Sequence, residues 1–314
     1  MARYITRRVL AAIPVVVGVL LVVFVLLRLI PGDPVQIFYF GGEGSPNTSV
    51  SQEVLDTARR AYNLDKSIPV QFALYVADVF RGDLGRSLRT RQPIGSMIGE
   101  QFPATLQLTL AGMGVALVIG VLAGVLSAVR HHTIIDYASQ FVAVLGVSIP
   151  SFWLGIILIF IFSIRLGWLP AIANGHGKEL ILPAVSLGVA AAAIIARLTR
   201  SSMLDVMSRD FIRTARAKGL AERGVVWRHA LRNALIPVVT IIGLQFGALL
   251  AGAVVIEVVF TRQGLGFTLV KSIITRDYPV VQALVMLSAI IYIVINILVD
   301  VLYTYIDPRV RLAD

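Results

Sequence analysis

Six stretches of this chain are apolar and long enough to cross a lipid bilayer, and this feature limits the possible folds more than any other. A helix that crosses the hydrocarbon core needs about 20 mainly apolar residues. The chain is 57% hydrophobic and only 15% charged, with a mean hydropathy of +0.83, which is far too apolar for a soluble domain of 314 residues. We therefore predict an all-α polytopic membrane protein with six transmembrane helices. The spans are expected at residues 9–30, 105–129, 136–164, 180–195, 235–260 and 281–303.

The apolar spans divide the chain into three predicted parts. Residues 1–30 contain the N-terminus and the first span, and residues 31–104 form a large external loop region. Residues 105–314 form the core transmembrane domain, which is interrupted by a polar loop at residues 197–236. The first span is too long for the apolar core of a secretory signal and no small-residue cleavage site follows it, so we expect it to be retained. Two short helices are expected in the external region, at residues 50–62 and 69–80.

The polar loop at residues 197–236 predicts the orientation of the chain in the membrane. It carries nine of the 28 Lys and Arg residues, against three acidic residues. Short loops rich in Lys and Arg stay on the cytoplasmic side, and Arg3, Arg7 and Arg8 precede the first span. We expect the loop and both termini to be cytoplasmic. The net charge of +10 therefore reflects topology, and no basic patch with interleaved aromatic residues indicates nucleic-acid binding.

The periodicity of the cytoplasmic loop predicts a short amphipathic helix. Asp205 lies four residues before Arg209, the favourable order for an ion pair on a helix, and Gly219 is placed to end the helix in a left-handed conformation. On these residues alone, the helix could simply lie on anionic lipid headgroups. The apolar face is expected to contain Met203, Leu204, Met207, Phe211 and Ala215, and the basic face Arg209, Arg213 and Arg216.

Two polar features within the spans are candidates for function. Pro150 interrupts the third span and should kink it, with the kink facing the protein interior. Glu257 lies near the outer end of the fifth span, where a carboxylate is a functional-site candidate; the alternative is an interfacial Glu paired with Arg262 or Arg276. The residues predicted to line a translocation pathway are Ser148, Pro150, Ser151, Gln245 and Glu257.

The sequence lacks the motifs of an enzyme or a metal protein. There is no cysteine, no His-Glu-x-x-His zinc helix, no Gly-x-Ser-x-Gly elbow and no Walker A sequence. We therefore expect no catalytic site, no cofactor and no metal bound by this chain. Ionisable residues fall near span ends, which argues against an ion-coupled secondary transporter without excluding it. A receptor or scaffold without transport is a further alternative.

Several motifs occur along the chain in a fixed order. They are Pro31-Gly-Asp-Pro34, Ser148-Ile-Pro-Ser-Phe152, Asp210–Gly219 with Ala230–Pro237, Gly264-Leu-Gly266 and Arg276-Asp-Tyr-Pro279. With these motifs, the chain resembles over nearly its whole length the permeases of peptide-type ABC importers, and within them the first of two related membrane subunits. The general form of the family's cytoplasmic loop has Glu-Ala-Ala before the Gly, whereas Arg213, Thr214 and Ala215 stand here, as is usual in the peptide branch.

The resemblance implies a fold, partners and a coupling segment. It implies the type I ABC importer permease fold in a bacterial inner membrane, with a second permease subunit, two cytosolic ATPases that hold ATP and Mg²⁺, and an external solute-binding protein. The substrate would be a dipeptide or oligopeptide, with glutathione or a nickel complex as alternatives. The residues that would contact an ATPase are Arg213, Thr214, Ala215, Arg216, Ala217, Lys218, Gly219 and Leu220.

Overall fold

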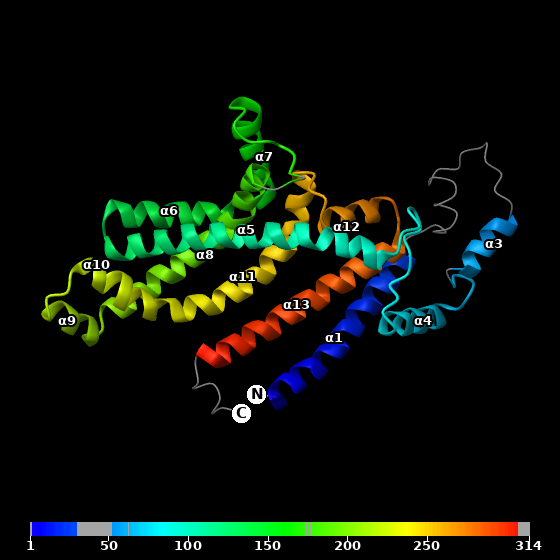
Figure 1. The fold of residues 1–314 in the computed structure, drawn as a ribbon, viewed down its shortest axis with the longest axis horizontal. Helices are drawn as coiled ribbons and strands as arrows, with labels where there is room; N and C mark the ends of the chain where they lie inside the picture. Colours follow the sequence, from blue (N-terminus) through cyan, green and yellow to red (C-terminus); the bar gives the residue numbers. More distant parts are fainter. Residues whose placement is uncertain (1, 30–51, 62, 174, 176, 307–314) are drawn as a thin grey trace. The chain divides into compact units, whose positions relative to one another are not determined.

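The computed structural model describes residues 2–29, 52–61, 63–173, 175 and 177–306, and most of this part of the chain is helical (Figure 1). The chain divides into two compact units. One contains Met1–Pro103 and Phe267–Ile293, and the other contains Ala104–Gly266 and Val294–Asp314. Each unit is described by itself below.

The first unit contains the first span and the predicted external helices. Its helices are α1 (Ala2–Leu29), α3 (Gln52–Ala61), α4 (Ile68–Phe80), the first turns of α5 (Ile94–Val129), most of α12 (Leu265–Ile274) and the first half of α13 (Tyr278–Ile306). The two short helices expected at residues 50–62 and 69–80 are confirmed as α3 and α4. The Phe24 ring of α1 packs edge-on against Phe72 of α4, with ring centroids 5.3 Å apart. This contact ties α4 to the first span.

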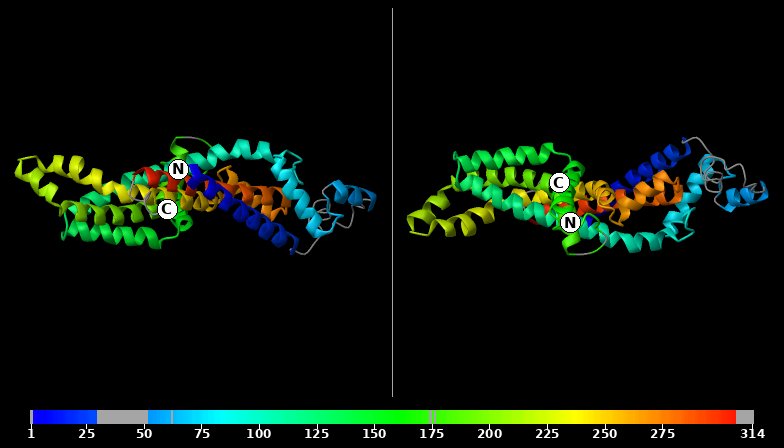
Figure 2. Two further views of the ribbon diagram at one scale, coloured as in Figure 1. Left: turned by 90° about the horizontal axis from the view of Figure 1, so that it is seen from below. Right: turned by 90° about the horizontal axis from the view of Figure 1, so that it is seen from above.

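The second unit contains the remaining spans and the polar loop. Its elements are the rest of α5, α6 (Ile134–Ser148), α7 (Ser151–Leu158), a π-helix η1 (Ile159–Arg165), α8 (Lys178–Met207), α9 (Asp210–Ala217), α10 (Glu222–Gly224), a π-helix η2 (Val225–Ala230), α11 (Leu231–Val259) and the end of α13. α6 packs along α8, and α11 packs against α8 from another side (Figure 1, Figure 2). α8 is therefore the central helix of this unit.

Small residues bring α5 and α8 close together. A Cβ added at Gly120 would lie 2.7 Å from the Ala192 carbonyl oxygen, and one at Gly124 would lie 2.6 Å from the Ala196 carbonyl oxygen. Backbones can approach this closely only where a side chain is missing, as is common in membrane helix pairs. The spacing of four residues keeps both glycines on the face of α5 that meets α8.

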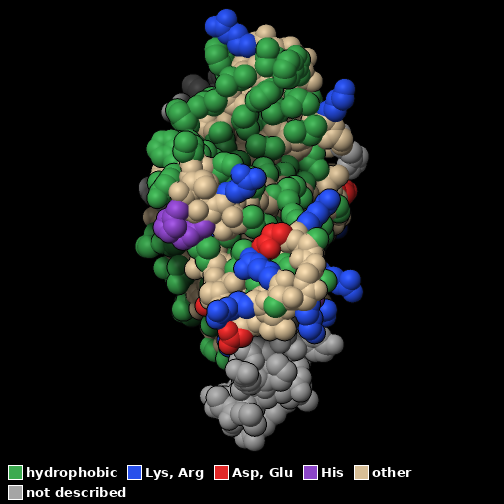
Figure 3. All heavy atoms as spheres, turned by 90° about the vertical axis from the view of Figure 1, so that its left-hand side faces the viewer, with side chains coloured by type: hydrophobic (Ala, Val, Ile, Leu, Met, Phe, Trp, Pro, Cys, Tyr) green, Lys and Arg blue, Asp and Glu red, His purple; other side chains and the backbone are tan. Residues whose placement is uncertain are grey.

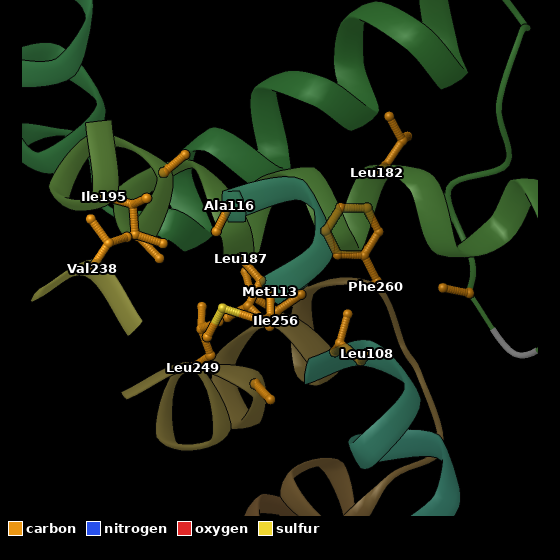
Figure 4. Packing of buried hydrophobic residues seen from close by; sticks show 14 residues of the cluster. Leu108, Met113, Ala116, Leu182, Leu187, Ile195, Val238, Leu249, Ile256 and Phe260 are labelled. Carbon is orange, nitrogen blue, oxygen red and sulfur yellow. The ribbon is translucent and has the colours of Figure 1, made fainter. Parts of the chain in front are cut away.

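The core of the second unit lies where α5, α8 and α11 meet. Leu108 and Met113 of α5, Ile195 of α8, and Ile256 with the following Phe260 pack together there, with little or no exposed surface (Figure 4). Burial of such side chains stabilises each by about 1.5–3 kcal/mol in water, although in a bilayer close packing contributes more than exclusion of water. The three helices are therefore held as one block.

The described residues contain five helices long and apolar enough to cross a membrane, and a sixth span if the α6–α7 pair is counted as one. The pair bends by 103° at Ser148–Ser151. The expected kink is thus a full break, because a proline disfavours the helical conformation of the residue before it, and Ile149 is extended with ψ 122°. The second span also begins earlier than expected, since α5 starts at Ile94. The six-span, all-α prediction is confirmed.

Candidate functional site

The polar loop folds as two helices joined by a short break. α8 continues to Met207, Arg209 is extended with ψ 152°, and α9 begins at Asp210. Ser208 Oγ donates to the Asp205 carbonyl oxygen at 2.7 Å, and Arg209 Nη2 pairs with Asp205 Oδ2 at 3.0 Å. The predicted Asp205–Arg209 pair is confirmed. The prediction of one continuous amphipathic helix through residues 203–215 is wrong, since Ser208 and Arg209 end one helix and start another.

The break changes which face of α9 is buried. Ile212 and Ala215 are buried, whereas Phe211, which was expected on the apolar face, is 43% exposed. Ile212 and Ala215 pack into a cluster formed by α5, α8, α9, η2 and α11. Its other buried members are Val125, Ala128, Met203, Val206, Val225, Val226, Ala230, Leu231 and Ala234. α9 is therefore fixed from behind by side chains of four other elements.

The end of α9 has the left-handed turn that the sequence predicts. Gly219 has φ +77°, and the Gly219 N–H donates to the Arg216 carbonyl oxygen at 2.9 Å. The Leu220 N–H donates to the Ala215 carbonyl oxygen at 3.4 Å, which satisfies a carbonyl left over at the helix end. No side chain lies within 4 Å of a Cβ added at Gly219. The glycine is needed here for its backbone conformation and not for space.

The outer face of the loop is basic with exposed apolar residues among the charges. Arg216 donates to both carboxylate oxygens of Glu222, at 2.7 and 3.1 Å, and this hydrogen bonding raises the pKa of Arg216. Leu220 is 46% exposed beside it. Figure 3 looks onto this end of the unit, where basic side chains lie around a few acidic ones. The exposed predicted coupling residues are Arg213, Thr214, Arg216, Ala217, Lys218, Gly219 and Leu220, and only Ala215 of the set is buried.

A buried ion pair that sequence patterns did not predict supports the loop. Asp136 is only 1% exposed and forms a bidentate ion pair with Arg200 of α8. Arg200 Nε donates to Asp136 Oδ1 at 2.7 Å, and Arg200 Nη2 donates to Asp136 Oδ2 at 2.8 Å. Ser127 Oγ, the His132 N–H and Gln140 Nε2 also donate to the Asp136 carboxylate. Sixty-four positions separate the two charges, and an Asp in the first turn of a helix is ordinarily explained by the helix dipole alone. In the sequence, Arg200 is one of nine basic residues of the predicted polar loop, and nothing singles it out as the partner of Asp136.

The five predicted pathway residues lie in two regions of the second unit. Ser148 and Pro150 are exposed and Ser151 is half-buried, all at the break between α6 and α7. Gln245 is half-buried midway along α11. Glu257, near the end of α11, is fully buried.

Glu257 organises the loop that follows α11. Its Oε1 accepts from Thr105 Oγ1 at 2.6 Å, and its Oε2 accepts from the Gly266 N–H at 2.8 Å. A Cβ at position 264 would overlap the Glu257 carboxylate, so only glycine fits at this position. The carboxylate is therefore enclosed by the Gly264–Gly266 segment and is not at an open interface.

Arg262 cross-links the same loop to neighbouring backbone. Its guanidinium donates to the carbonyl oxygens of Ala104, Ala173 and Gly175, at 3.3, 2.9 and 3.1 Å, and to Gln107 Oε1 at 2.8 Å. Burial lowers the pKa of Arg262, while nearby Glu257 and Glu179 oppose that effect. The end of the unit away from the basic loop is thus closed by a polar network. Among the described residues, no group of three or more His, Asp or Glu side chains could hold a metal ion.

Apolar spans around a packed helical core, with an exposed basic helix anchored on one loop, fit a subunit of a membrane transporter. The chain belongs to the family of binding-protein-dependent transport system inner membrane components: that family matches residues 120–312, and the family's N-terminal region matches residues 1–109. It is a membrane-spanning permease subunit of an ABC importer of the peptide type.

Individual relatives match over almost the full chain. The glutathione transport system permease protein GsiC of Escherichia coli O6:H1 is 43% identical over 99% of both chains. The dipeptide transport system permease protein DppB of Alkalihalophilus pseudofirmus is 42% identical over 99% of this chain and 100% of its own. A chain of the inward-facing MetNI methionine ABC transporter has a TM-score of 0.58 and 22% identity, over 69% of this chain and 99% of its own. That structural match supports the fold alone.

Proposed function

We propose that this chain is the membrane subunit of a short-peptide importer and that an ATPase docks on Arg213–Leu220. The observation that carries the proposal is the two-sided character of α9. Its inner face packs into the cluster of Ile212 and Ala215 with the neighbouring helices, its outer face presents charged side chains, and the exposed Leu220 follows in the turn after it. A helix fixed in this way moves with α5, α8 and α11, so a push on its outer face is transmitted to the spans. A helix that merely lay on lipid would need no such anchoring.

The substrate class follows from what the relatives have in common. The relatives described above are named for glutathione and for dipeptide transport. Glutathione is itself a tripeptide, so a short peptide is the chemistry that the two share. We propose that Ser148, Pro150, Ser151, Gln245 and Glu257 lie on the pathway of that substrate. For the first three, support comes from the 103° bend between α6 and α7, where Ser148 and Pro150 are exposed within a membrane span.

The proposed assembly has a second permease, two ATPases that bind ATP and Mg²⁺, and a solute-binding protein outside the cell. The loop at residues 197–236 and both termini face the cytoplasm, and residues 31–104 lie outside. The excess of Lys and Arg in the loop supports this orientation. In this arrangement the chain performs no hydrolysis itself.

The proposal is tested by uptake of a labelled dipeptide into proteoliposomes that contain the assembled complex. Uptake should require ATP on the side of the ATPases and the solute-binding protein on the opposite side, and it should survive an uncoupler. Inactivating the ATPases should abolish it. Uptake that persists without ATPase activity but stops with the uncoupler would instead show an ion-coupled transporter.

A further inference from the structure

A cavity of about 710 Å³ lies within the first unit. α1, α3, α4, the turn after α4 and the start of α13 line it. Its volume is within the range of about 300–1,000 Å³ typical of small-molecule sites. None of the coupling or pathway residues lines this cavity. It is therefore separate from the two sites described above.

Three buried polar groups in the cavity wall have no acceptor in the described part of the chain. They are the hydroxyl groups of Tyr75 and Tyr278 and the Nε2 of Gln282. Tyr278 is 8% exposed and Gln282 is 6% exposed. Buried donors in native structures nearly always have a partner, and three unpaired donors on residues that line one cavity favour a ligand that supplies the acceptors. Burial raises the pKa of Tyr75 to about 12, which keeps its hydroxyl a donor at physiological pH.

One arginine in the cavity wall, Arg28, is preorganised to bind an anionic group. The Arg28 guanidinium lies 3.6 Å from the centroid of the Phe24 ring and donates to Gln71 Oε1 at 3.0 and 2.7 Å. A guanidinium has five N–H groups, and the contact with Gln71 uses two of them. Its position is fixed from two sides, so little conformational entropy is lost when a carboxylate binds.

The same cavity also contains carboxylates. Asp78 of α4 and Asp83 of the following turn line it together with three arginines, Arg28, Arg59 and Arg86. Asp78 Oδ1 also lies 3.7 Å from Arg81 Nη1 in an exposed ion pair. Asp83 Oδ1 accepts from the Gly85 N–H at 2.8 Å, which fixes the turn. A wall with both signs of charge suits a ligand that carries both signs, and it disfavours an anionic lipid headgroup, which would prefer an all-basic wall.

We infer that this cavity binds a short peptide with free termini. The peptide carboxylate pairs with Arg28, its ammonium group faces Asp78 and Asp83, and its carbonyl oxygens accept from the unpaired donors of Tyr278 and Gln282. The choice of a peptide rests on the proposed function, while the mixed charge and the unpaired donors come from the cavity alone. In the proposed orientation the site is on the outer side, where a ligand released by the solute-binding protein arrives.

The test is calorimetric titration of tri-alanine into the permease complex in lipid nanodiscs, without the solute-binding protein. The variants are Tyr278→Phe and Gln282→Leu. The matched control is Tyr292→Phe, on the same helix α13 but 55% exposed and outside the cavity. Tyr278→Phe removes a hydroxyl that has no partner within the described part of the chain, so the unfolding midpoint should not fall.

Loss of one hydrogen bond should weaken binding about three- to tenfold in Tyr278→Phe and in Gln282→Leu, with Tyr292→Phe unchanged. Tri-alanine that is N-acetylated and C-amidated should bind at least about tenfold more weakly, because both charge-assisted contacts are lost. Equal binding by Tyr278→Phe and the control, or by the blocked peptide, would overturn the inference. A heat of titration that depends on the lipid composition of the nanodisc and not on the peptide would also overturn it.

The proposed function is read out separately by ATP-driven uptake with the same complex and the solute-binding protein present. Uptake of peptide without binding in the cavity overturns the inference and leaves the proposed function intact. Peptide binding in the cavity without any ATP-driven peptide uptake would overturn the proposed function but would leave the inferred binding site supported.

Discussion

The Asp136 carboxylate joins three helices and a turn through one side chain. It accepts from Arg200 of α8, Ser127 of α5, Gln140 of its own helix and the His132 N–H of the turn. A buried ion pair adds little net stability compared with apolar residues, yet removal of one partner leaves an uncompensated charge. The residue is therefore a point at which a single change disturbs the anchoring of the loop.

We expect Asp136→Asn to destabilise the second unit by about 3–5 kcal/mol, because Arg200 would keep its charge in a site where it is only 20% exposed. The measurement is the unfolding midpoint of the purified complex. Asp205→Asn is the control, since Asp205 and Arg209 form a pair in which both side chains are more than half exposed, and its loss should cost less than about 1 kcal/mol. Similar shifts for the two variants would refute the structural role of Asp136.

Position 219 requires glycine because its backbone is left-handed, a conformation that costs a residue with a side chain about 1–2 kcal/mol. Gly219→Leu should therefore displace Leu220 and the end of α9, and we expect at least a tenfold loss of uptake with normal membrane insertion. Gly224→Leu is matched to it, because Gly224 is also exposed and has open space at its Cβ but has an ordinary φ of −67°. Full uptake by the Gly219 variant would contradict the coupling role of this segment.

At the scale of elements, close packing of α5 on α8 holds the second unit together. Gly124→Ala would place a methyl group against the Ala196 carbonyl oxygen and the Thr199 side chain, and overpacking of this kind costs about 1–3 kcal/mol. Gly114→Ala on the same helix meets no atom within 4 Å and should be neutral. Comparison of their thermal unfolding tests whether the contact between α5 and α8 is as tight as the structure shows, and equal stability would contradict it.

Local sequence signals predicted the elements well where one residue decides the conformation. Gly219 ended α9 as expected, and Pro150 interrupted the third span at the expected place, although as a full break and not as a kink. The apolar periodicity was less reliable across Ser208. The apolar repeat continues through the break because α8 and α9 pack on the same cluster, so the sequence does not indicate that one helix ends and another begins. The break changes the buried face of α9, and Phe211 is exposed. Neither π-helical segment, Ile159–Arg165 nor Val225–Ala230, carries a distinguishing sequence signal.

Contacts between distant residues could not be predicted from one sequence. Thr105 and Glu257 are 152 positions apart, and Asp136 and Arg200 are 64 apart. Each is an ordinary residue in its local context, so nothing in the sequence indicated that the Glu257 carboxylate accepts hydrogen bonds from Thr105 and from the Gly266 N–H. The coupling residues are proposed from resemblance, whereas the anchoring of α9 through Ile212 and Ala215 became visible only in the three-dimensional packing.

At the scale of the whole molecule, the chain is a permease subunit, and we propose that a partner ATPase supplies the energy for transport. In the proposed mechanism the spans provide the path, and α9 connects them to an ATPase. The decisive contact is therefore the one between the exposed face of α9 and an ATPase in the assembled complex. Everything proposed about transport depends on it.

The most direct test uses the absence of native cysteine in this chain. A single cysteine replaces Ala217, which is exposed on α9, and a second variant carries it at Ser96, which is exposed on α5. After treatment of the assembled complex with a short thiol-to-amine cross-linker, Ala217→Cys should link to an ATPase subunit and Ser96→Cys should not. An Ala217→Cys complex that transports peptide but never cross-links to the ATPase, or that reacts only with a reagent added outside the cell, would contradict the coupling role of α9.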